Sequence, residues 1–187
     1  MSAARLTLVS PRVERRAPEH RELCVVLACH EILLAMPVRA IERLVLPDEV
    51  RAVGGGSGGG GGETKSWQIV AVGEQRYAAC NLGTLLGVAP FNAAWALMRV
   101  KHKGNDLHLA LHTGACQIVQ PLSQGVTLPG GIFRARSGAI SAAFPTSLLK
   151  GREQSPDVGL WLDPERLWHS VELDAAAVAL EEHGRKG

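Results

Sequence analysis

The sequence is poor in aromatic residues and has no long apolar run, and each shortage argues against a class of protein. Phe, Trp and Tyr make up only 4% of its 187 residues, so a nucleic-acid surface built from stacked aromatic rings is not expected. No run of about 18 apolar residues occurs, which argues against a membrane-spanning helix. The first residues contain no apolar segment of the length that a secretory signal needs, and we therefore expect a cytoplasmic protein.

An excess of one charge is also missing. The 20 Lys and Arg residues nearly balance the 18 Asp and Glu residues and leave a formal net charge of +2, so no global field points to nucleic acid or to a membrane surface. The four cysteines are scattered, and no two of them form a C-x-x-C pair. This spacing argues against a disulfide framework and fits a reducing compartment. The cysteines are Cys24, Cys29, Cys80 and Cys116.

The sequence does contain enough aliphatic residues to build a core. Hydrophobic residues make up 46% of the chain, and Leu, Val, Ile and Ala must supply most of the interior because aromatic rings are scarce. The length fits one domain, or two small lobes that share one core. Residues 1–21 carry several arginines and the helix breakers Pro11 and Pro18, which predict a flexible basic arm. A C-terminal helix and tail are expected at 171–187.

Short apolar runs separated by turn residues predict a mainly β fold for residues 22–170. Many short strands with Gly and Pro between them favour small barrels over alternating β/α units. The expected strands are the hairpin 23–34 and the runs 67–72, 76–82, 95–101, 107–111, 116–122, 132–136, 138–144 and 158–162. Short helical turns are expected within 38–46, 83–87 and 163–168, and a polar, Ala-rich helix at 174–182.

The segment Gly54–Gly62 reads GGGSGGGGG and predicts a flexible surface loop, because ordering so many glycines costs too much backbone entropy. A natural loop and an engineered linker that replaces native residues would both have this composition. The tract lacks the Lys-Ser/Thr of a phosphate-binding loop and the spaced glycines of a dinucleotide-binding turn. No cofactor is therefore expected from it.

The order of these segments resembles the CheW-like family of bacterial chemosensory adaptors. After the first strand pair, residues 36–41 read MPVRAI, which resembles the L-P-V-x-x-I/V element of the family. The Trp-led strand at 67–72 and the segment 78–87, AACNLGTLLG, resemble the next family strand and its D-L…L-G loop. Residues 160–167, LWLDPERL, resemble the closing L-L-D-x-x-x-L motif.

The resemblance implies a fold, a function and a set of partners. The fold would be two small five-stranded β-barrel lobes with short helices, lobe one at about 22–90 and lobe two at about 91–170. The protein would be no enzyme and would need no cofactor or metal. It would act as an adaptor that couples a histidine kinase to receptors or to other components of a chemosensory array or motility system. Its partners would be the P5 domain of a CheA-like kinase, a chemoreceptor or another CheW-like domain.

The resemblance also implies where partners bind. The turn between the Trp67 strand and the Tyr77 strand matches the partner-contacting turn of the family. Arginine anchors interfaces through bidentate pairing and stacking, so exposed arginines elsewhere are further candidates. The candidate contact residues are Glu74, Gln75, Arg76, Arg39 and Arg43.

Three family positions differ in this chain. The N-L-R-G turn is replaced by VGEQR at 72–76, the aspartate of the D-L motif is Asn81, and the aspartate of a later V-D-x-V-x-x-V segment is Gly114. The apolar pattern around them is kept. We therefore expect a diverged adaptor with the family fold.

Sites for metal ions and for nucleophilic catalysis are not expected. His108 and His112 would lie on one strand face roughly 13 Å apart, too far for a single zinc ion, with His102 in the preceding strand. Cys29 and His30 are neighbours in a strand, where adjacent side chains point to opposite faces, and no G-x-S-x-G motif occurs. The alternative function is a small basic β-barrel that binds nucleic acid, which a pI near 8.5 and the pair Arg134 and Arg136 allow.

Overall fold

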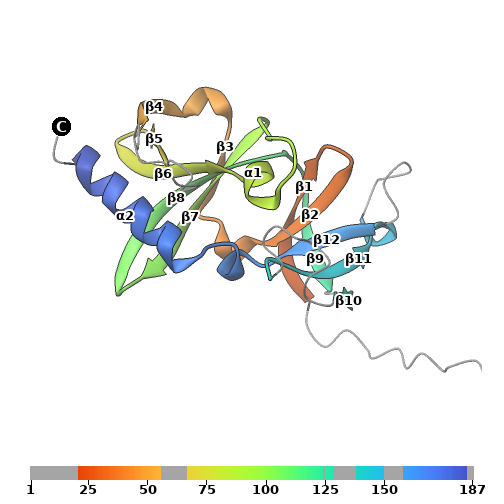
Figure 1. Cartoon of the computed structure of the whole chain (residues 1–187). Coiled ribbons are helices and arrows are strands. Elements are labelled where there is room, and N and C mark those ends of the chain that lie inside the picture. Colours follow the sequence, from red (N-terminus) through yellow and green to blue (C-terminus); the bar gives the residue numbers. More distant parts are fainter. Residues whose placement is uncertain (1–20, 56–66, 124, 129–137, 150–157, 185–187) are drawn as a thin grey trace, which may run out of the picture.

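The computed structural model describes residues 21–55, 67–123, 125–128, 138–149 and 158–184, and these form two six-stranded sheets with a few short helices and one C-terminal helix (Figure 1). The mainly β prediction is confirmed. Within these residues no helix has both the length and the apolar character that crossing a membrane requires.

Sheet A combines the two ends of the chain. Its strand order is β10-β11-β12-β2-β1-β9, and neighbouring strands are antiparallel except for the parallel pair β12 and β2. The strands are β1 Arg21–Cys29, β2 Ile32–Pro37, β9 Ala115–Ser123, β10 Val126–Thr127, β11 Ile140–Pro145 and β12 Val158–Leu162. The predicted hairpin at 23–34 is therefore present, and β1 lies between its hairpin partner and β9.

Sheet B is formed by the middle of the chain. Its order is β3-β7-β8-β6-β5-β4, with β6 and β8 parallel and the other neighbours antiparallel. The strands are β3 Arg43–Val45, β4 Arg51–Gly55, β5 Gln68–Val72, β6 Gln75–Asn81, β7 Ala94–His102 and β8 Asn105–Thr113. Figure 1 shows the strands of the two sheets in separate groups, joined through β3 and β9.

The helices are short except at the C-terminus. The 3-10 turns are η1 Val38–Ala40, η2 Pro47–Glu49, η3 Thr146–Leu148 and η4 Pro164–Arg166, and the α-helices are α1 Leu82–Leu86 and α2 Ser170–Gly184. The Asn81 side chain begins α1 by accepting a hydrogen bond from the Gly83 N–H at 2.9 Å, and Gly87 ends it with φ +74°. Asp163 begins η4 in the same way, through the Glu165 N–H at 3.1 Å.

Three apolar clusters hold these elements together. The largest lies between the sheets and α2 and includes Leu34 and Met36 of β2, Leu109 and Leu111 of β8, and Leu173 of α2. A second cluster covers the other face of sheet A and includes Cys24, Val26, Leu33, Phe144 and Trp161. A third covers the other face of sheet B and includes Val45, Val70, Tyr77, Trp95 and Leu97. Both sheets are thus buried on both faces over much of their area.

The lobes differ from the predicted ones in strand number, closure and boundaries. Each sheet has six strands in an open order instead of five in a closed barrel. The sheets are also not made of residues 22–90 and 91–170, because the hairpin β1–β2 pairs with β9 on one side and with β12 on the other. The physical reason is that both faces of β1 are apolar, so this strand is most stable in the middle of a sheet.

Several predicted segments fall partly or wholly outside the described residues. Residues 1–20 of the expected N-terminal arm and the expected strand at 132–136 lie outside them. Of the glycine tract, Gly54 and Gly55 belong to β4 instead of to a loop, and 56–62 lie outside the description. Gly54 can enter the strand because its missing side chain leaves room for the imidazole of His183, whose Nε2 would lie 2.4 Å from an added Cβ.

Candidate functional site

The β5–β6 turn presents three of the five candidate contact residues on one groove. Val72 pairs with Gln75, so Gly73 and Glu74 form a two-residue turn, and Gly73 has a φ of +60°. Glu74, Gln75 and Arg76 line an open groove of about 610 Å³ together with the start of β8 and the second half of α2. The structure therefore places these three residues together, next to α2. The family resemblance did not predict this neighbour.

Arg76 is not free in this groove. Its guanidinium donates a hydrogen bond to the backbone carbonyl of His183 in the last turn of α2. Gln75, by contrast, is exposed and donates from Nε2 to the Arg76 carbonyl at 3.3 Å. A partner that uses Arg76 must therefore share it with α2 or replace the helix carbonyl.

Arg39 and Arg43 lie elsewhere and each has an acidic neighbour. The Arg39 Nε donates to Glu22 Oε1 at 2.6 Å, and this hydrogen bond raises the pKa of Arg39. Arg39 lines a different groove, between η1, β7 and the start of α2. Arg43 donates to Glu49. Both side chains are more than half exposed, at 69% and 58%, so they are accessible to a partner although they are paired.

The three histidines considered for metal binding have structural roles. His112 stacks on Trp95, with ring centroids 4.0 Å apart and planes 1° apart, and burial lowers its pKa. His108 meets the edge of Tyr77 at 5.7 Å, and His102 pairs with Asp174 at 2.8 Å. In the part of the chain that the structure describes, no three His, Cys, Asp or Glu side chains are grouped as metal ligands.

The cysteines are poor nucleophiles. Burial raises the pKa of Cys24 to about 12 and that of Cys29 to about 11, the latter against a backbone hydrogen bond at Gly114 that lowers it. Burial also raises the pKa of Cys116, which lies on β9. Since the thiolate is the reactive form, these thiols are almost entirely protonated near neutral pH.

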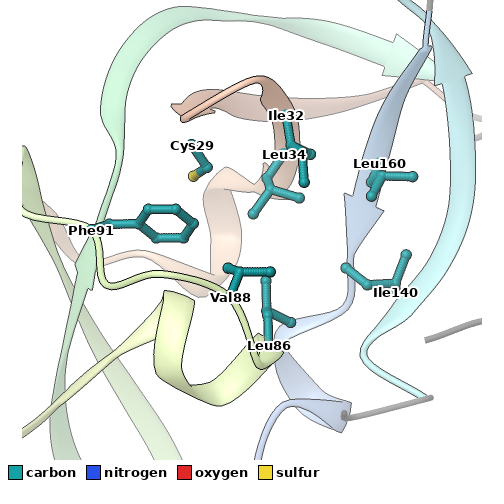
Figure 2. A pocket seen from close by; sticks show the side chains of 8 residues that line it. All are labelled: Cys29, Ile32, Leu34, Leu86, Val88, Phe91, Ile140 and Leu160. Carbon is teal, nitrogen blue, oxygen red and sulfur yellow. The ribbon is translucent and has the colours of Figure 1, made fainter. Parts of the chain in front are cut away.

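An apolar cleft between sheet A and the α1 segment was not predicted. It is lined by Cys29, Ile32, Leu34, Leu86, Val88, Phe91, Ile140 and Leu160. Figure 2 shows these side chains converging from the β1–β2 hairpin, from α1 and the segment after it, and from β11 and β12. The cavity between them has a volume of about 40 Å³. Ile32 and Val88 remain 37% and 42% exposed at this cleft, so apolar surface there is in contact with water.

Sequence reasoning missed this cleft because its residues come from three separated segments. A weak signal was present, since Ile32 follows the polar turn pair His30 and Glu31, and Val88 follows the helix-ending Gly87. Apolar residues next to turns are often exposed, but the sequence does not tell which turns meet in space. The role of α2 beside Arg76 was missed for the same reason.

Among the comparisons with known proteins, only the comparison of structures finds a similar protein. No protein-family model matches the sequence, and no curated protein is similar to it in sequence. Among solved structures, the chain is similar to the scaffolding protein TtCheW from Thermoanaerobacter tengcongensis, with a TM-score of 0.55 and 11% sequence identity. The match covers 84% of this chain and 94% of TtCheW. The chain therefore has the fold of a CheW scaffolding protein.

Proposed function

We propose that this protein is a non-catalytic adaptor of a bacterial chemosensory system that couples a histidine kinase to receptors or to other array or motility components. The observation that carries the proposal is the structural match to a scaffolding protein, which covers 84% of this chain and 94% of that protein. The buried, protonated thiols and the structural histidines support a binding role over a catalytic one.

Two surfaces suit partner binding in different ways. The groove at the β5–β6 turn offers the mixed charges of Glu74 and Arg76, which select partners by electrostatic complementarity. The cleft between sheet A and the α1 segment is lined almost wholly by aliphatic and aromatic side chains, and Ile32 and Val88 are partly exposed at it. We propose that an apolar surface of a partner covers the exposed Ile32 and Val88 side chains at the mouth of this cleft, while polar contacts at the turn fix the orientation.

The nucleic-acid alternative has less support in the described residues. The exposed cations Arg43, Arg99, Lys101 and Lys103 each have an acidic partner within 4.0 Å, so they do not form an unbalanced basic stripe. Arg134 and Arg136 lie outside the described residues. Balanced charge pairs give little of the counterion release that drives binding to phosphates.

The decisive experiment is a titration of the full-length protein against the recombinant P5 domain of a CheA-like kinase encoded in the same genome, and against the signalling tip of a receptor from that genome. Binding to either with a Kd in the micromolar range or below is expected. A variant with Val88→Asp, which places a charge at the mouth of the cleft, should weaken binding at least tenfold with little change in melting temperature. Absence of binding to both partners would overturn the proposal.

A further inference from the structure

The C-terminal helix α2 packs on sheet B through a regular stripe of side chains. Leu173, Ala176, Ala177 and Leu180 are buried or half-buried against the central core, at the spacing i, i+3, i+4, i+7 of one helix face. The helix contacts β5, β6 and β8. Figure 1 shows it lying along these strands, at the end of the molecule away from sheet A. Sheet B thus has a surface that accepts one amphipathic helix with two small residues at its centre.

Polar contacts fix the first half of this helix firmly. The Trp67 Nε1 donates to the Glu172 carbonyl at 3.0 Å, and Asp174 accepts from Lys103 Nζ at 2.5 Å. The His102 Nε2 lies 2.8 Å from the same carboxylate oxygen. Leu173 and Ala176, the two fully buried residues of α2, also belong to this half. The N-terminal half is therefore an integral part of the fold.

The second half is held by fewer contacts. Leu180 is only half-buried, Val178 is 55% exposed, and Glu181, Glu182 and Gly184 are exposed. Besides the partly buried packing of Ala177, Ala179 and Leu180, this half has the hydrogen bond from Arg76 to the His183 carbonyl and the approach of the His183 ring to Gly54. Segments with few buried apolar side chains open at low free-energy cost, so the last two turns can leave the sheet without unfolding the rest.

We propose that the face of sheet B beside the β5–β6 turn is a helix-binding surface, which the last two turns of α2 cover in the unbound chain and yield to a helix of a partner. The inference rests on the proposed function, because it assigns the partner class and the regulation of the β5–β6 turn. A fitting partner helix carries two adjacent small residues followed by a leucine, as α2 does. It also carries a carboxylate near its end, which pairs with Arg76 more strongly than the neutral His183 carbonyl does.

Substitutions on the exposed face of α2 can change how often its last two turns leave the sheet, without altering the surface on which they pack. Val178 points to solvent, so Val178→Gly weakens the helix and Val178→Ala strengthens it through backbone propensity alone. We expect hydrogen exchange of the amides at 179–184 to be about fivefold faster in the Gly variant than in the Ala variant. The amides of β6 and β8 should exchange at the same rate in both full-length proteins.

The surface itself is probed in trans with a synthetic fluorescent peptide of residues 170–184, which has the chemistry assigned to the partner. The peptide should bind full-length Val178→Gly about fivefold more tightly than full-length Val178→Ala, as read by fluorescence anisotropy. A peptide with Leu180→Asp serves as the matched control and should not bind. Equal binding of the peptide to both variants, or no binding to either, would overturn the inference.

This result is separable from the test of the adaptor function. The kinase and receptor domains could fail to bind while the peptide still binds more tightly to the Val178→Gly protein. In that case the adaptor proposal fails and the helix-binding surface stands. If they bind with equal affinity to the Val178→Gly and Val178→Ala proteins, the adaptor proposal stands and displacement of α2 by a partner is refuted.

Discussion

Asn81 and Gly114 stand where the CheW-like pattern has aspartates, and the structure explains both residues. The Asn81 Oδ1 accepts from the Gly83 and Phe91 N–H groups at 2.9 and 3.0 Å, while its Nδ2 donates to the Phe91 carbonyl at 2.6 Å. A carboxylate cannot make the last bond. At Gly114 a Cβ would lie 1.9 Å from the Ala28 carbonyl oxygen. The residue at each of these two positions thus meets a local packing or hydrogen-bond requirement.

Asn81→Asp should lower the free energy of unfolding by about 1–3 kcal/mol, because the Phe91 carbonyl loses its donor and faces a negative charge instead. Chemical denaturation of the variant and of the wild type measures the difference. Asn105→Asp, at the exposed first residue of β8, is the matched control and should change stability by about 0.5 kcal/mol or less. Equal stability of all three proteins would contradict the role of the Asn81 Nδ2 group as the donor to the Phe91 carbonyl.

Gly114→Ala should destabilise the protein by about 3 kcal/mol, since the atom that its Cβ meets is a backbone oxygen at the crossing between the sheets. Gly138→Ala is the control, because its Cβ would meet only the Arg166 side chain at 3.8 Å. Thermal melts of both variants measure the contrast. A loss at Gly114 no larger than that at Gly138 would show that the backbone near Ala28 adapts.

Arg76→Glu tests the turn as a partner contact. We expect it to weaken binding of the kinase P5 domain or the receptor tip by at least tenfold, because interface arginines contribute about 2 kcal/mol or more. Its effect on stability should stay near 1 kcal/mol, since it removes one hydrogen bond to the end of α2. Arg166→Glu reverses a charge at a side chain that is 66% exposed and should leave affinity unchanged. Unchanged affinity of the Arg76 variant would move the binding face toward Arg39 and Arg43.

At the scale of elements, α2 connects the predicted binding turn to the rest of the fold. The helix was predicted from its Ala-rich, polar composition at 174–182, and it begins earlier, at Ser170. Its docking depends on partners distant in sequence, namely Trp67, Arg76, His102 and Lys103. The element is therefore locally encoded as a helix, whereas its position is set by other strands.

The docking of α2 should depend on pH through Asp174. Hydrogen bonds from His102 and Lys103 lower the pKa of Asp174 below its ordinary value of 3.8. A carboxyl group with a lowered folded-state pKa stabilises the fold above its unfolded pKa, and this contribution is lost as the pH falls through the folded pKa. We expect the protection factors of the α2 amides, which compare their exchange with that of an unfolded chain at the same pH, to fall below pH 3.8. In the Asp174→Asn variant, the protection of the α2 amides should already be lower at pH 6 and should show no further fall in acid. A fall of equal size in the variant would show that other carboxyl groups cause it.

At the scale of the whole molecule, the chain passes from sheet A to sheet B after β2 and returns between β8 and β9, where Gly114 lies. Each sheet is thus completed by strands that are distant in sequence, and both share the central core. Such topology couples the two sheets in folding and makes most of the stabilising contacts non-local.

We therefore expect thermal and chemical unfolding to follow a single cooperative transition for both sheets, with coincident far-ultraviolet circular dichroism and tryptophan fluorescence. A fragment of residues 22–90 should not fold, because β1 and β2 lose β9 and β12 while β6 loses β8. Two separate transitions, or a folded fragment with dispersed amide resonances, would show that the lobes are independent.

The sequence by itself determined the local elements. The apolar run of β1, the turn at His30 and Glu31, the Gly-rich turns at Gly73 and Gly104, and the C-terminal helix all follow from residue preferences within a few positions. Such preferences act between neighbours in the chain, so they are readable from the sequence alone. Its resemblance to a family also indicated the mainly β fold, whose likeness to a CheW scaffolding protein is seen in the structure.

Only the tertiary structure decided which strands pair, where the cleft lies and what holds Arg76. β1 is apolar on both faces, which shows that it is central in a sheet but not that β2 and β9 are its neighbours. Ile32, Val88 and Leu160 meet at one cleft although no local pattern relates them. The groove at Arg76 exists because α2 returns across β6 from the far end of the chain. These features depend on the free energy of contacts between distant segments, which a pattern of neighbouring residues does not contain.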